Sequence, residues 1–567
     1  MSHPTSGRIA IHFAPDGYST AGHRLMGRQA AGAGLLRAIA GAADLDTVGC
    51  FAAGQAHANE GERLLRAAGY GGRVEWIPQH RPRELERFGT LYHPGPGIER
   101  LAWRRLGLGE RRYSLCGITH TTASHAVMTS LANLPVAPVR SWDAVICTSR
   151  VVRDSVRRVL ERQAEYLGAR LGAQRFELPQ LPLIPLGVHS GDFEIDAARR
   201  DAARRRCGIG EGDVAFLFAG RLSFHAKAHP QQMFSALERA ANAADAANAG
   251  RRAVHLILCG WFANEAIDKA FREAAAALCP SVRLTVLDGR DDDDVRAAWA
   301  AADVFTSLAD NVQETFGLTP LEAMAAGLPC VVSDWNGYRD TVRDGVDGYR
   351  IPTVMPGAGA GLDLAQRYDD GVDSYDAYCG HTSQAVAVDG PALAQAYARL
   401  IDDATLRRTL GDNGRRHVRA AFDWSVVFGR YRALWDELDE RRRADAALAP
   451  ALPVAVPDRL DPFDVFASYA SARITPASLV ELAPDASLAL LRQYRELAIN
   501  RFASTSLPTL EAFGQIFGSI ESRPMQVDEL LDTLGPCDRP MLLRGLAWLC
   551  KMDLLRITPP EEPGEEF

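Results

Sequence analysis

Short apolar runs alternate with longer helical stretches over residues 8–420. This alternation predicts β–α–β crossover units and mostly parallel sheets. In the first block we expect helices around Leu35–Ala40 and Arg150–Leu167. Its strand candidates are Arg8–Phe13, Arg73–Ile77, Thr90–His93, Ser114–Thr119 and Ala144–Thr148, with Leu183–Val188 as the last strand and exit loop. The pattern indicates one doubly wound, Rossmann-like domain over residues 1–190.

A second block begins at Val214–Phe218, a continuous apolar run typical of a strand covered on both faces. Its further strand candidates are Val254–Leu258, Leu284–Leu287, Val304–Leu308 and Cys330–Ser333. We therefore expect an α/β protein in which a second Rossmann-like domain, residues 191–420, faces the first across a cleft. We expect residues 192–206 to bridge the two domains, residues 354–389 to form a Gly-rich and Tyr/Asp-rich excursion, and residues 421–445 to return as helices.

The sequence changes character after a Pro/Ala-rich linker at residues 446–457. Residues 458–567 are predicted to form a mainly helical accessory domain whose end, residues 527–557, follows a winged-helix-like order of helix, turn, helix and short strand. Residues 451–567 hold 10 Lys/Arg against 17 Asp/Glu, and so carry most of the net charge of −8. This acidity disfavours DNA and favours self-association or docking of a partner.

The composition, 47% hydrophobic and 24% charged, is that of an ordinary globular protein. Nucleic acid is not expected as a substrate, because the chain offers no basic stripe. Neither a cationic leader followed by an apolar run nor a membrane-length apolar stretch is present. We expect a cytoplasmic, non-spanning protein, with peripheral contact at the inner face of a membrane left open. Ten cysteines occur singly, without the Cys-x-x-Cys spacing of zinc sites.

Only three of the 63 cationic residues are lysines, and one of them, Lys227, follows the first strand of the second block. Arg221 follows the end of this strand, and Lys227 comes six residues after Arg221. Open α/β sheets bind ligands at the carboxyl ends of their strands. Each cation alone could be a solvated loop residue, but the pair at this edge predicts a phosphate site.

The segment 311–333 predicts a short helix over residues 320–326. Thr319 suits its N-cap, Pro320 its first position, and Gly327 with Pro329 its end. Free N–H groups at the start of this helix, approached through Phe316, Gly317 and Leu318, would suit a diphosphate.

Two carboxylates, Glu314 and Glu322, bracket this anion site. Glu322 alone could be the capping-box partner of Thr319, and Glu314 a solvated loop residue. Together they could bind the hydroxyls of a ligand whose phosphates lie between them. A nucleotide sugar has that layout.

These residues, with Phe-Gly and Glu-Ala-Met-Ala-x-Gly between the glutamates, resemble the donor site of retaining family-4 glycosyltransferases (glycosyl transferases group 1), which have the glycosyltransferase-B fold. Looser matches are Trp142–Ser149, similar to a late strand of the family's first domain, and Ile184–Phe193, similar to its interdomain segment. The resemblance covers residues 8–437 and leaves the excursion and the C-terminal region unassigned.

The resemblance implies a role for each matched residue. Arg221 and Lys227 would hold the donor diphosphate together with backbone at Phe316, Gly317 and Leu318. Glu322 would bind the ribose, Glu314 the transferred sugar, and Asp288 and Arg290 would contact a base that they do not identify. His120 is the candidate active-site histidine, and His93 a weaker one. The Gly-rich loop Asp16–Gly22 occupies the acceptor side.

The expected reaction is transfer of a sugar, of the hexosyltransferase type, from a nucleotide diphosphate sugar to a hydroxyl acceptor on a glycan, lipid-linked or protein molecule, with retention. No metal is expected, and the acidic run Asp291–Asp294 is predicted to start a helix. Two alternatives stay open: a nucleotide-sugar epimerase or glycosyl phosphorylase on the same fold, and a catalytically silent nucleotide-sugar-binding scaffold.

Overall fold

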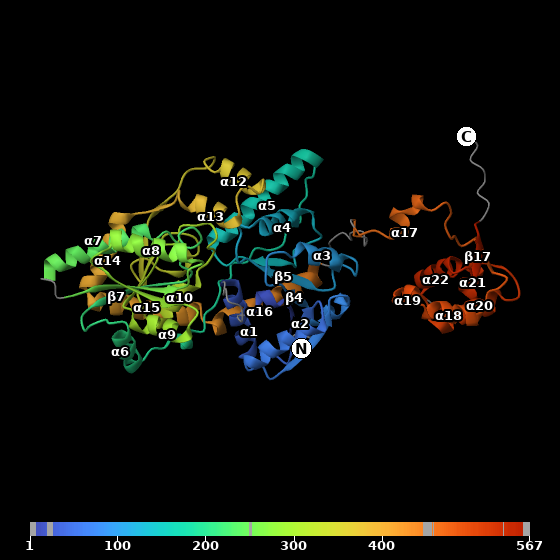
Figure 1. Cartoon of the computed structure of the whole chain (residues 1–567), viewed down its shortest axis with the longest axis horizontal. Coiled ribbons are helices and arrows are strands. Elements are labelled where there is room, and N and C mark those ends of the chain that lie inside the picture. The colour runs from blue at the N-terminus through green and yellow to red at the C-terminus, as the bar shows by residue number, and fades with distance from the viewer. Residues whose placement is uncertain are drawn as a thin grey trace. The chain divides into compact units, whose positions relative to one another are not determined.

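The computed structural model describes residues 7–19, 27–248, 252–445, 456–457, 459–536 and 538–559. The chain divides into two compact units, Met1–Val456 and Pro457–Phe567. The larger unit contains two parallel six-stranded sheets (Figure 1).

The first sheet has the strand order β3-β2-β1-β4-β5-β6. Its strands are β1 Arg8–His12, β2 Thr47–Ala52, β3 Arg73–Pro78, β4 Thr90–Tyr92, β5 Ser114–Ile118 and β6 Ala144–Ile146. The α-helices of this part are α1 Gly27–Ala40, α2 Gln55–Ala67, α3 Glu99–Leu106, α4 His125–Asn133 and α5 Arg150–Leu171. Strand order reverses between β1 and β4, and such a switch point opens a crevice at the carboxyl ends of the strands.

The second sheet repeats this topology in the order β12-β11-β10-β7-β8-β9. Its strands are β7 Val214–Ala219, β8 Val254–Gly260, β9 Arg283–Asp288, β10 Val304–Ser307, β11 Cys330–Ser333 and β12 Gly348–Ile351. Its α-helices are α6 Ala197–Arg206, α7 Gln231–Asn248, α8 Glu265–Leu278, α9 Asp292–Ala301, α10 Leu318–Ala326, α11 Tyr338–Thr341, α14 Gly390–Asp402 and α15 Ala404–Ala421. The switch point lies between β7 and β10. The predicted class, two Rossmann-like sheets, is confirmed.

Helix α16, Trp424–Asp445, returns from the second sheet to pack on the first. The rings of Tyr431 and Trp435 each lie 6.0 Å from the ring of Tyr92 on β4. The larger unit is therefore closed by a helix that follows the second sheet in sequence but buries its aromatic side chains against the first.

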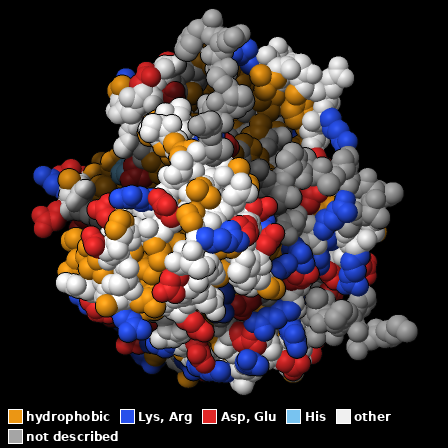
Figure 2. Space-filling view, turned by 90° about the vertical axis from the view of Figure 1, so that its right-hand side faces the viewer, with side chains coloured by type: hydrophobic (Ala, Val, Ile, Leu, Met, Phe, Trp, Pro, Cys, Tyr) orange, Lys and Arg blue, Asp and Glu red, His pale blue; other side chains and the backbone are white. Residues whose placement is uncertain are grey.

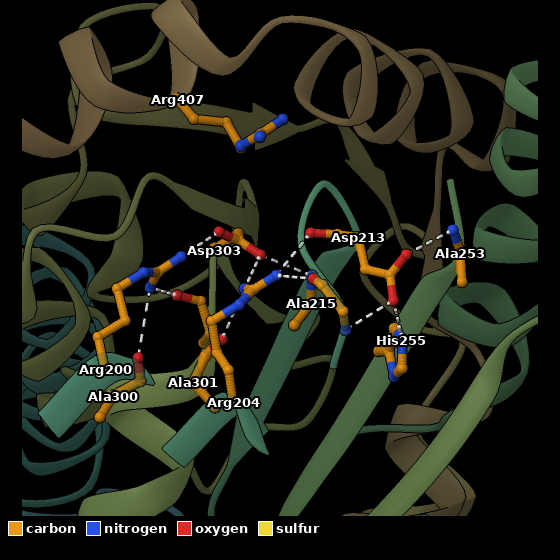
Figure 3. Close-up of polar contacts among 12 residues, drawn as sticks. Arg200, Arg204, Asp213, Ala215, Ala253, His255, Ala300, Ala301, Asp303 and Arg407 are labelled. Carbon is orange, nitrogen blue, oxygen red and sulfur yellow. Dashed lines mark hydrogen bonds and ion pairs between the residues drawn. The ribbon is translucent and has the colours of Figure 1, made fainter. Parts of the chain in front are cut away.

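Helix α6, which leads into the second sheet, is fixed to it by two arginines (Figure 3). Arg200 and Arg204 contact the two carboxylate oxygens of Asp303 at 2.5 and 2.9 Å, and Asp303 also accepts the backbone N–H of Ala215 on β7 at 2.9 Å. Arg204 further donates to the carbonyl of Ala301, the last residue of α9. Cations suit the end of a helix, where carbonyls lack partners.

Two parts of the predicted pattern need correction. The segment 183–188 is not a strand: it makes only isolated bridges, from Leu183 to Cys147 and from Val188 to Asp423. Pro182 and Pro185 lack the N–H groups that a ladder requires. Conversely, β2 and β12 were not anticipated, although β2 is buried along its whole length.

The excursion is ordered, with β13 Thr353–Val354, α12 Leu362–Asp369, α13 Tyr375–Ser383 and β14 Ala387–Val388. Strands β13 and β14 pair antiparallel, so the segment leaves and rejoins the second domain at one place.

The C-terminal unit has its own core around a three-stranded antiparallel sheet, β16-β15-β17. Its elements are α17 Pro462–Val465, β15 Leu479–Leu482, α18 Leu488–Glu496, α19 Ala498–Arg501, α20 Leu510–Ile520, β16 Met525–Gln526, α21 Val527–Thr533, α22 Arg539–Lys551 and β17 Leu555–Thr558. The predicted order of helix, helix and strand over residues 527–557 is therefore observed. Phe463, Tyr469, Ile499 and Phe502 are exposed on this unit. Figure 2 shows surface hydrophobic side chains interspersed with charged ones.

Among the described residues, no helix is both long and apolar enough to cross a membrane.

Candidate functional site

The amino terminus of α10 lies two residues earlier than predicted. The helix begins at Leu318, and Gly317, with φ at 84°, occupies the N-cap. Thr319 and Pro320 therefore lie inside the first turn, so the predicted N-cap role of Thr319 is wrong. The alternative role of Glu322, as capping-box partner of Thr319, falls with it. Glycine permits the left-handed backbone that starts the helix here. A Cβ at position 317 would also lie 2.1 Å from Cε1 of Tyr338.

Lys227 and Glu314 form an ion pair across the switch point of the second sheet. Lys227 follows β7, Glu314 follows β10, and Lys227 Nζ lies 2.5 Å from Glu314 Oε2. Burial alone would lower the pKa of Lys227, but the charge and hydrogen bond of Glu314, together with Tyr338, outweigh burial and raise that pKa. Burial alone would raise the pKa of Glu314, but Lys227 and the backbone N–H groups of Thr315 and Phe316 lower it. Both groups are therefore charged at neutral pH.

Arg221 lies beside this pair and is only partly engaged. Its Nη2 donates to the carbonyl of Ala226 at 2.9 Å and to Oε1 of Gln313 at 2.6 Å. Within the described part of the chain, Nε and Nη1 of Arg221 donate to no protein group. The guanidinium is thus held in place while keeping donors for a ligand, as a phosphate-binding arginine requires.

Glu322 lies in the second turn of α10 without a hydrogen-bond or ion-pair partner among the described residues. Burial raises its pKa to about 7, although the Lys227 charge acts in the opposite direction. Glu314 and Glu322 therefore differ in protonation near neutral pH because only Glu314 contacts the lysine. Phe316, between them in sequence, is fully buried.

His120 follows β5 of the first sheet and meets the loop that carries Glu314. Thr315 Oγ1 donates to the His120 carbonyl at 2.6 Å, and Ser149 Oγ donates to the Thr315 carbonyl at 2.8 Å. Burial and the charge of Arg28 lower the pKa of His120 to about 3. The structure thus joins a neutral histidine of the first domain to the phosphate-side loop of the second.

His93, after β4, packs against His12 at the end of β1. The two rings are 4.9 Å apart, and their Nδ1 atoms lie 2.8 Å apart. Burial lowers the pKa of His93 to about 3, aided by the charges of His12, Arg28 and His120, and that of His12 to about 4. Sequence analysis missed His12, although its place after an apolar strand was a usable signal. Neutral imidazoles thus lie at the ends of β1, β4 and β5.

Asp288 and Arg290 lie apart from these groups, at the end of the edge strand β9. They pair with each other at 2.7 Å and are exposed. The acidic run that follows starts α9 as predicted: Asp291 is its N-cap and accepts the N–H groups of Asp293 and Asp294, each at 2.9 Å. Among the described residues, no group of three or more His, Cys, Asp or Glu could hold a metal ion.

The predicted acceptor-side loop is described only in part. Asp16 begins it and pairs with Arg28 at 2.6 Å. Residues 20–22 of that prediction lie outside the described residues.

Three further residues shape the site and were missed. Gln313 and Thr315 flank Glu314, and their polar character next to it was the only local signal. Tyr338 is fully buried against Gly317 and bonds Ser307 Oγ through its hydroxyl at 2.9 Å.

Comparison with known proteins finds a family model that matches part of the second domain. A family model described as Glycosyl transferases group 1 matches residues 199–358. A D-inositol 3-phosphate glycosyltransferase of Salinispora arenicola is 28% identical over 49% of this chain and 54% of its own length. A phosphatidyl-myo-inositol mannosyltransferase of Mycobacterium leprae is 31% identical over 28% of this chain and 33% of its own length. The chain thus spans about half, or less, of the length of these curated relatives.

Among solved structures, the Anabaena protein HepE in complex with UDP and glucose is 17% identical, with a TM-score of 0.49. The alignment covers 76% of this chain and 99% of that one.

Proposed function

The segment 199–358 belongs to the group 1 glycosyl transferases, and from this premise we propose that the chain is a retaining glycosyltransferase. It transfers a sugar from a nucleotide diphosphate sugar to a hydroxyl acceptor in glycan or glycoconjugate synthesis. One observation carries the proposal: the partly buried Lys227–Glu314 pair, 2.5 Å apart, lies beside the guanidinium of Arg221, which keeps free donors.

This arrangement suits a donor whose negative charge grows as it reacts. The bond between the anomeric carbon and the diphosphate breaks, and the diphosphate leaves with the electron pair. Arg221, Lys227 and the N–H groups at Gly317 and Leu318 would stabilise that charge, since preorganised donors act strongly where water is excluded. In the retaining reaction the new glycosidic bond forms on the same face, and the acceptor proton passes to the leaving phosphate.

The remaining assignments follow the same logic. Glu314, charged and held by Lys227, would bind the transferred sugar, and Glu322 the ribose hydroxyls. Asp288 and Arg290 would contact the base from the edge of the sheet. His120, neutral and tied to Thr315, would hydrogen-bond the reacting sugar from the acceptor domain, and His93 would lie behind it.

The relatives' names direct the search for the acceptor. Polyol phosphates such as inositol 3-phosphate, and inositol lipids, are the first acceptors to test. A lipid-linked acceptor would place the chain at a membrane surface by peripheral contact. UDP sugars head the donor panel, because a relative of similar topology was crystallised with UDP.

The test is a panel of nucleotide sugars, scored for stabilisation against heat and for slow donor hydrolysis, followed by transfer assays on the donor that binds. A ligand present at 100 times its Kd should stabilise the folded state by about 2.7 kcal/mol. Binding with an acceptor-dependent product of retained configuration supports the proposal. Absence of both binding and transfer across the panel would contradict it.

The alternatives predict different products. An epimerase converts the donor without an acceptor, and a phosphorylase needs inorganic phosphate. A silent scaffold binds a nucleotide sugar but neither hydrolyses nor transfers it. The intact set of Arg221, Lys227, Glu314 and Glu322 favours an active transferase.

A further inference from the structure

The excursion between β13 and β14, whose helices α12 and α13 are labelled in Figure 1, contacts both domains of the larger unit. On the first-domain side, the ring of Tyr368 in α12 lies 3.6 Å from that of His125, the first residue of α4. The backbone N–H of His125 donates to the Tyr368 hydroxyl at 3.2 Å, and His125 Nε2 lies 2.9 Å from the Tyr368 carbonyl. The excursion is therefore attached to the segment that immediately follows His120.

On the second-domain side, α13 packs on the loop between Arg221 and Lys227. A Cβ at Gly380 would lie 2.9 Å from Cβ of His225 in that loop, so glycine is the residue that permits the contact. Helix α13 thus covers the phosphate-side loop while its own segment reaches the first domain.

Tyr375, the first residue of α13, ties this helix to the first domain through its hydroxyl. That oxygen lies 3.2 Å from Oγ1 of Thr121, the residue after His120. The same helix packs through Gly380 on the loop between Arg221 and Lys227. The Tyr375 hydroxyl therefore joins the acceptor-side segment to the helix that covers the phosphate-side loop.

We propose that Tyr375 is a positioning residue for sugar transfer: through Thr121 it ties helix α13, which covers the loop between Arg221 and Lys227, to the acceptor-side segment that carries His120. This inference rests on the proposed function. The excursion would hold the donor's phosphate-binding arginine in register with the acceptor domain, so that both substrates meet in one geometry.

The test compares Tyr375→Phe with Tyr378→Phe in the full chain. Both tyrosines are half-buried in α13, but the hydroxyl of Tyr378 has no hydrogen-bond partner among the described residues. We expect Y375F to lower kcat about tenfold, the effect of one lost hydrogen bond. The KM of the donor should stay within about threefold of wild type, because Arg221 keeps its bonds to Ala226 and Gln313. Y378F should behave as wild type in both parameters.

A second substitution separates positioning from a merely structural role. Thr121→Val removes the other half of the Thr121–Tyr375 contact and keeps the side-chain shape. The inference predicts that T121V, Y375F and the double variant share one reduced kcat, since groups acting through one contact are not additive. Additive losses, or a Y375F kcat within twofold of wild type, would overturn it.

The same assays separate this inference from the proposed function. If wild-type protein transfers sugar and Y375F matches Y378F, only the positioning role of Tyr375 is wrong. If wild-type protein neither binds nor transfers any nucleotide sugar, the proposed function fails, and the positioning role of Tyr375 fails with it. Thermal melts of all variants ensure that lost turnover is scored on folded protein.

Discussion

At the residue scale, one lysine decides the charge of the site. Two glutamates flank the start of α10, and both are largely shielded from water. Glu314 contacts Lys227 and has a lowered pKa, whereas Glu322 has no such partner and a pKa near 7. Their environments separate two chemically identical groups, as is common where carboxylates have different tasks.

Replacing Lys227 by methionine should reduce sugar transfer by roughly 10²–10³, the usual effect of removing one donor from a site of developing charge. Lys269→Met is the matched control, because Lys269 is exposed on α8 and forms no more than a surface pair with Glu273, at 3.7 Å. Steady-state rates of both variants test this. Transfer by K227M at the rate of K269M would remove Lys227 from the proposed site.

The same substitution leaves Glu314 charged and shielded without its partner. K227M should therefore melt at a lower temperature than wild type, and the double variant K227M/E314Q should recover stability but not activity. Thermal unfolding and transfer rates of the three proteins separate the structural from the chemical part. If the double variant were as unstable as K227M, the lost stability would not come from the unpartnered charge of Glu314.

The raised pKa of Glu322 makes a prediction about pH. The folded state holds this proton up to about pH 7, whereas a glutamate in the unfolded chain releases it near its ordinary value of 4.5. Between these values the folded state binds more protons, so Glu322 lowers stability as the pH rises. Relative to wild type, Glu322→Gln should gain stability from about pH 4.5 to 7 and then level off. Thermal melts at constant ionic strength measure this difference, and a flat difference would contradict it.

At the element scale, the start of α10 depends on a glycine. Gly317→Ala imposes an unfavourable positive φ, and its Cβ would overlap the ring of Tyr338. Gly345→Ala is the control, because Gly345 has φ at 70° but no atom within 4 Å of the added Cβ.

We expect G345A to cost about 1 kcal/mol of unfolding free energy from backbone strain alone. G317A should cost more and should weaken donor binding, because Tyr338 or the helix start must move. Denaturant unfolding and donor titration measure both effects. Equal costs for the two variants, with unchanged donor binding, would show that the tight contact with Tyr338 is relieved easily.

The elements that sequence predicts well are those whose signal is local. The apolar run Val214–Phe218 predicts β7, and the acidic start of α9 follows from dipole and capping rules. The helix 320–326 is also local, but its first residue was misplaced because Gly317 supplies the cap that Thr319 was expected to give. The segment 183–188 looks like a strand by apolarity alone, but Pro185 within it and Pro182 just before it prevent a ladder.

The site divides in the same way. Arg221 with Lys227, and Glu314 with Glu322, lie in two short segments with interpretable spacing. The contacts of Thr315 with His120 and of Tyr375 with Thr121 join residues far apart in sequence. Such pairs depend on how the two sheets and the excursion pack, which the periodicity of any one segment does not contain.

At the scale of the whole molecule, the two compact units have separate hydrophobic cores. The core of Pro457–Phe567 is built entirely from its own residues, with Phe513, Ile516 and Leu546 at its centre. The candidate donor site lies entirely within Met1–Val456. A ligand that binds one folded unit stabilises that unit by mass action.

We therefore expect the full chain to unfold in two transitions, of which a bound nucleotide sugar raises only the one belonging to Met1–Val456. Phe513→Ala removes a fully buried ring from the C-terminal core and should cost that unit about 3–5 kcal/mol. It should lower the other transition alone and leave the donor-induced shift and the transfer rate unchanged. Differential scanning calorimetry with and without donor measures both transitions in one experiment. If F513A lowered both transitions, or if donor raised both equally, the two units would unfold as one, and the C-terminal unit would have to be counted among the elements that support the site.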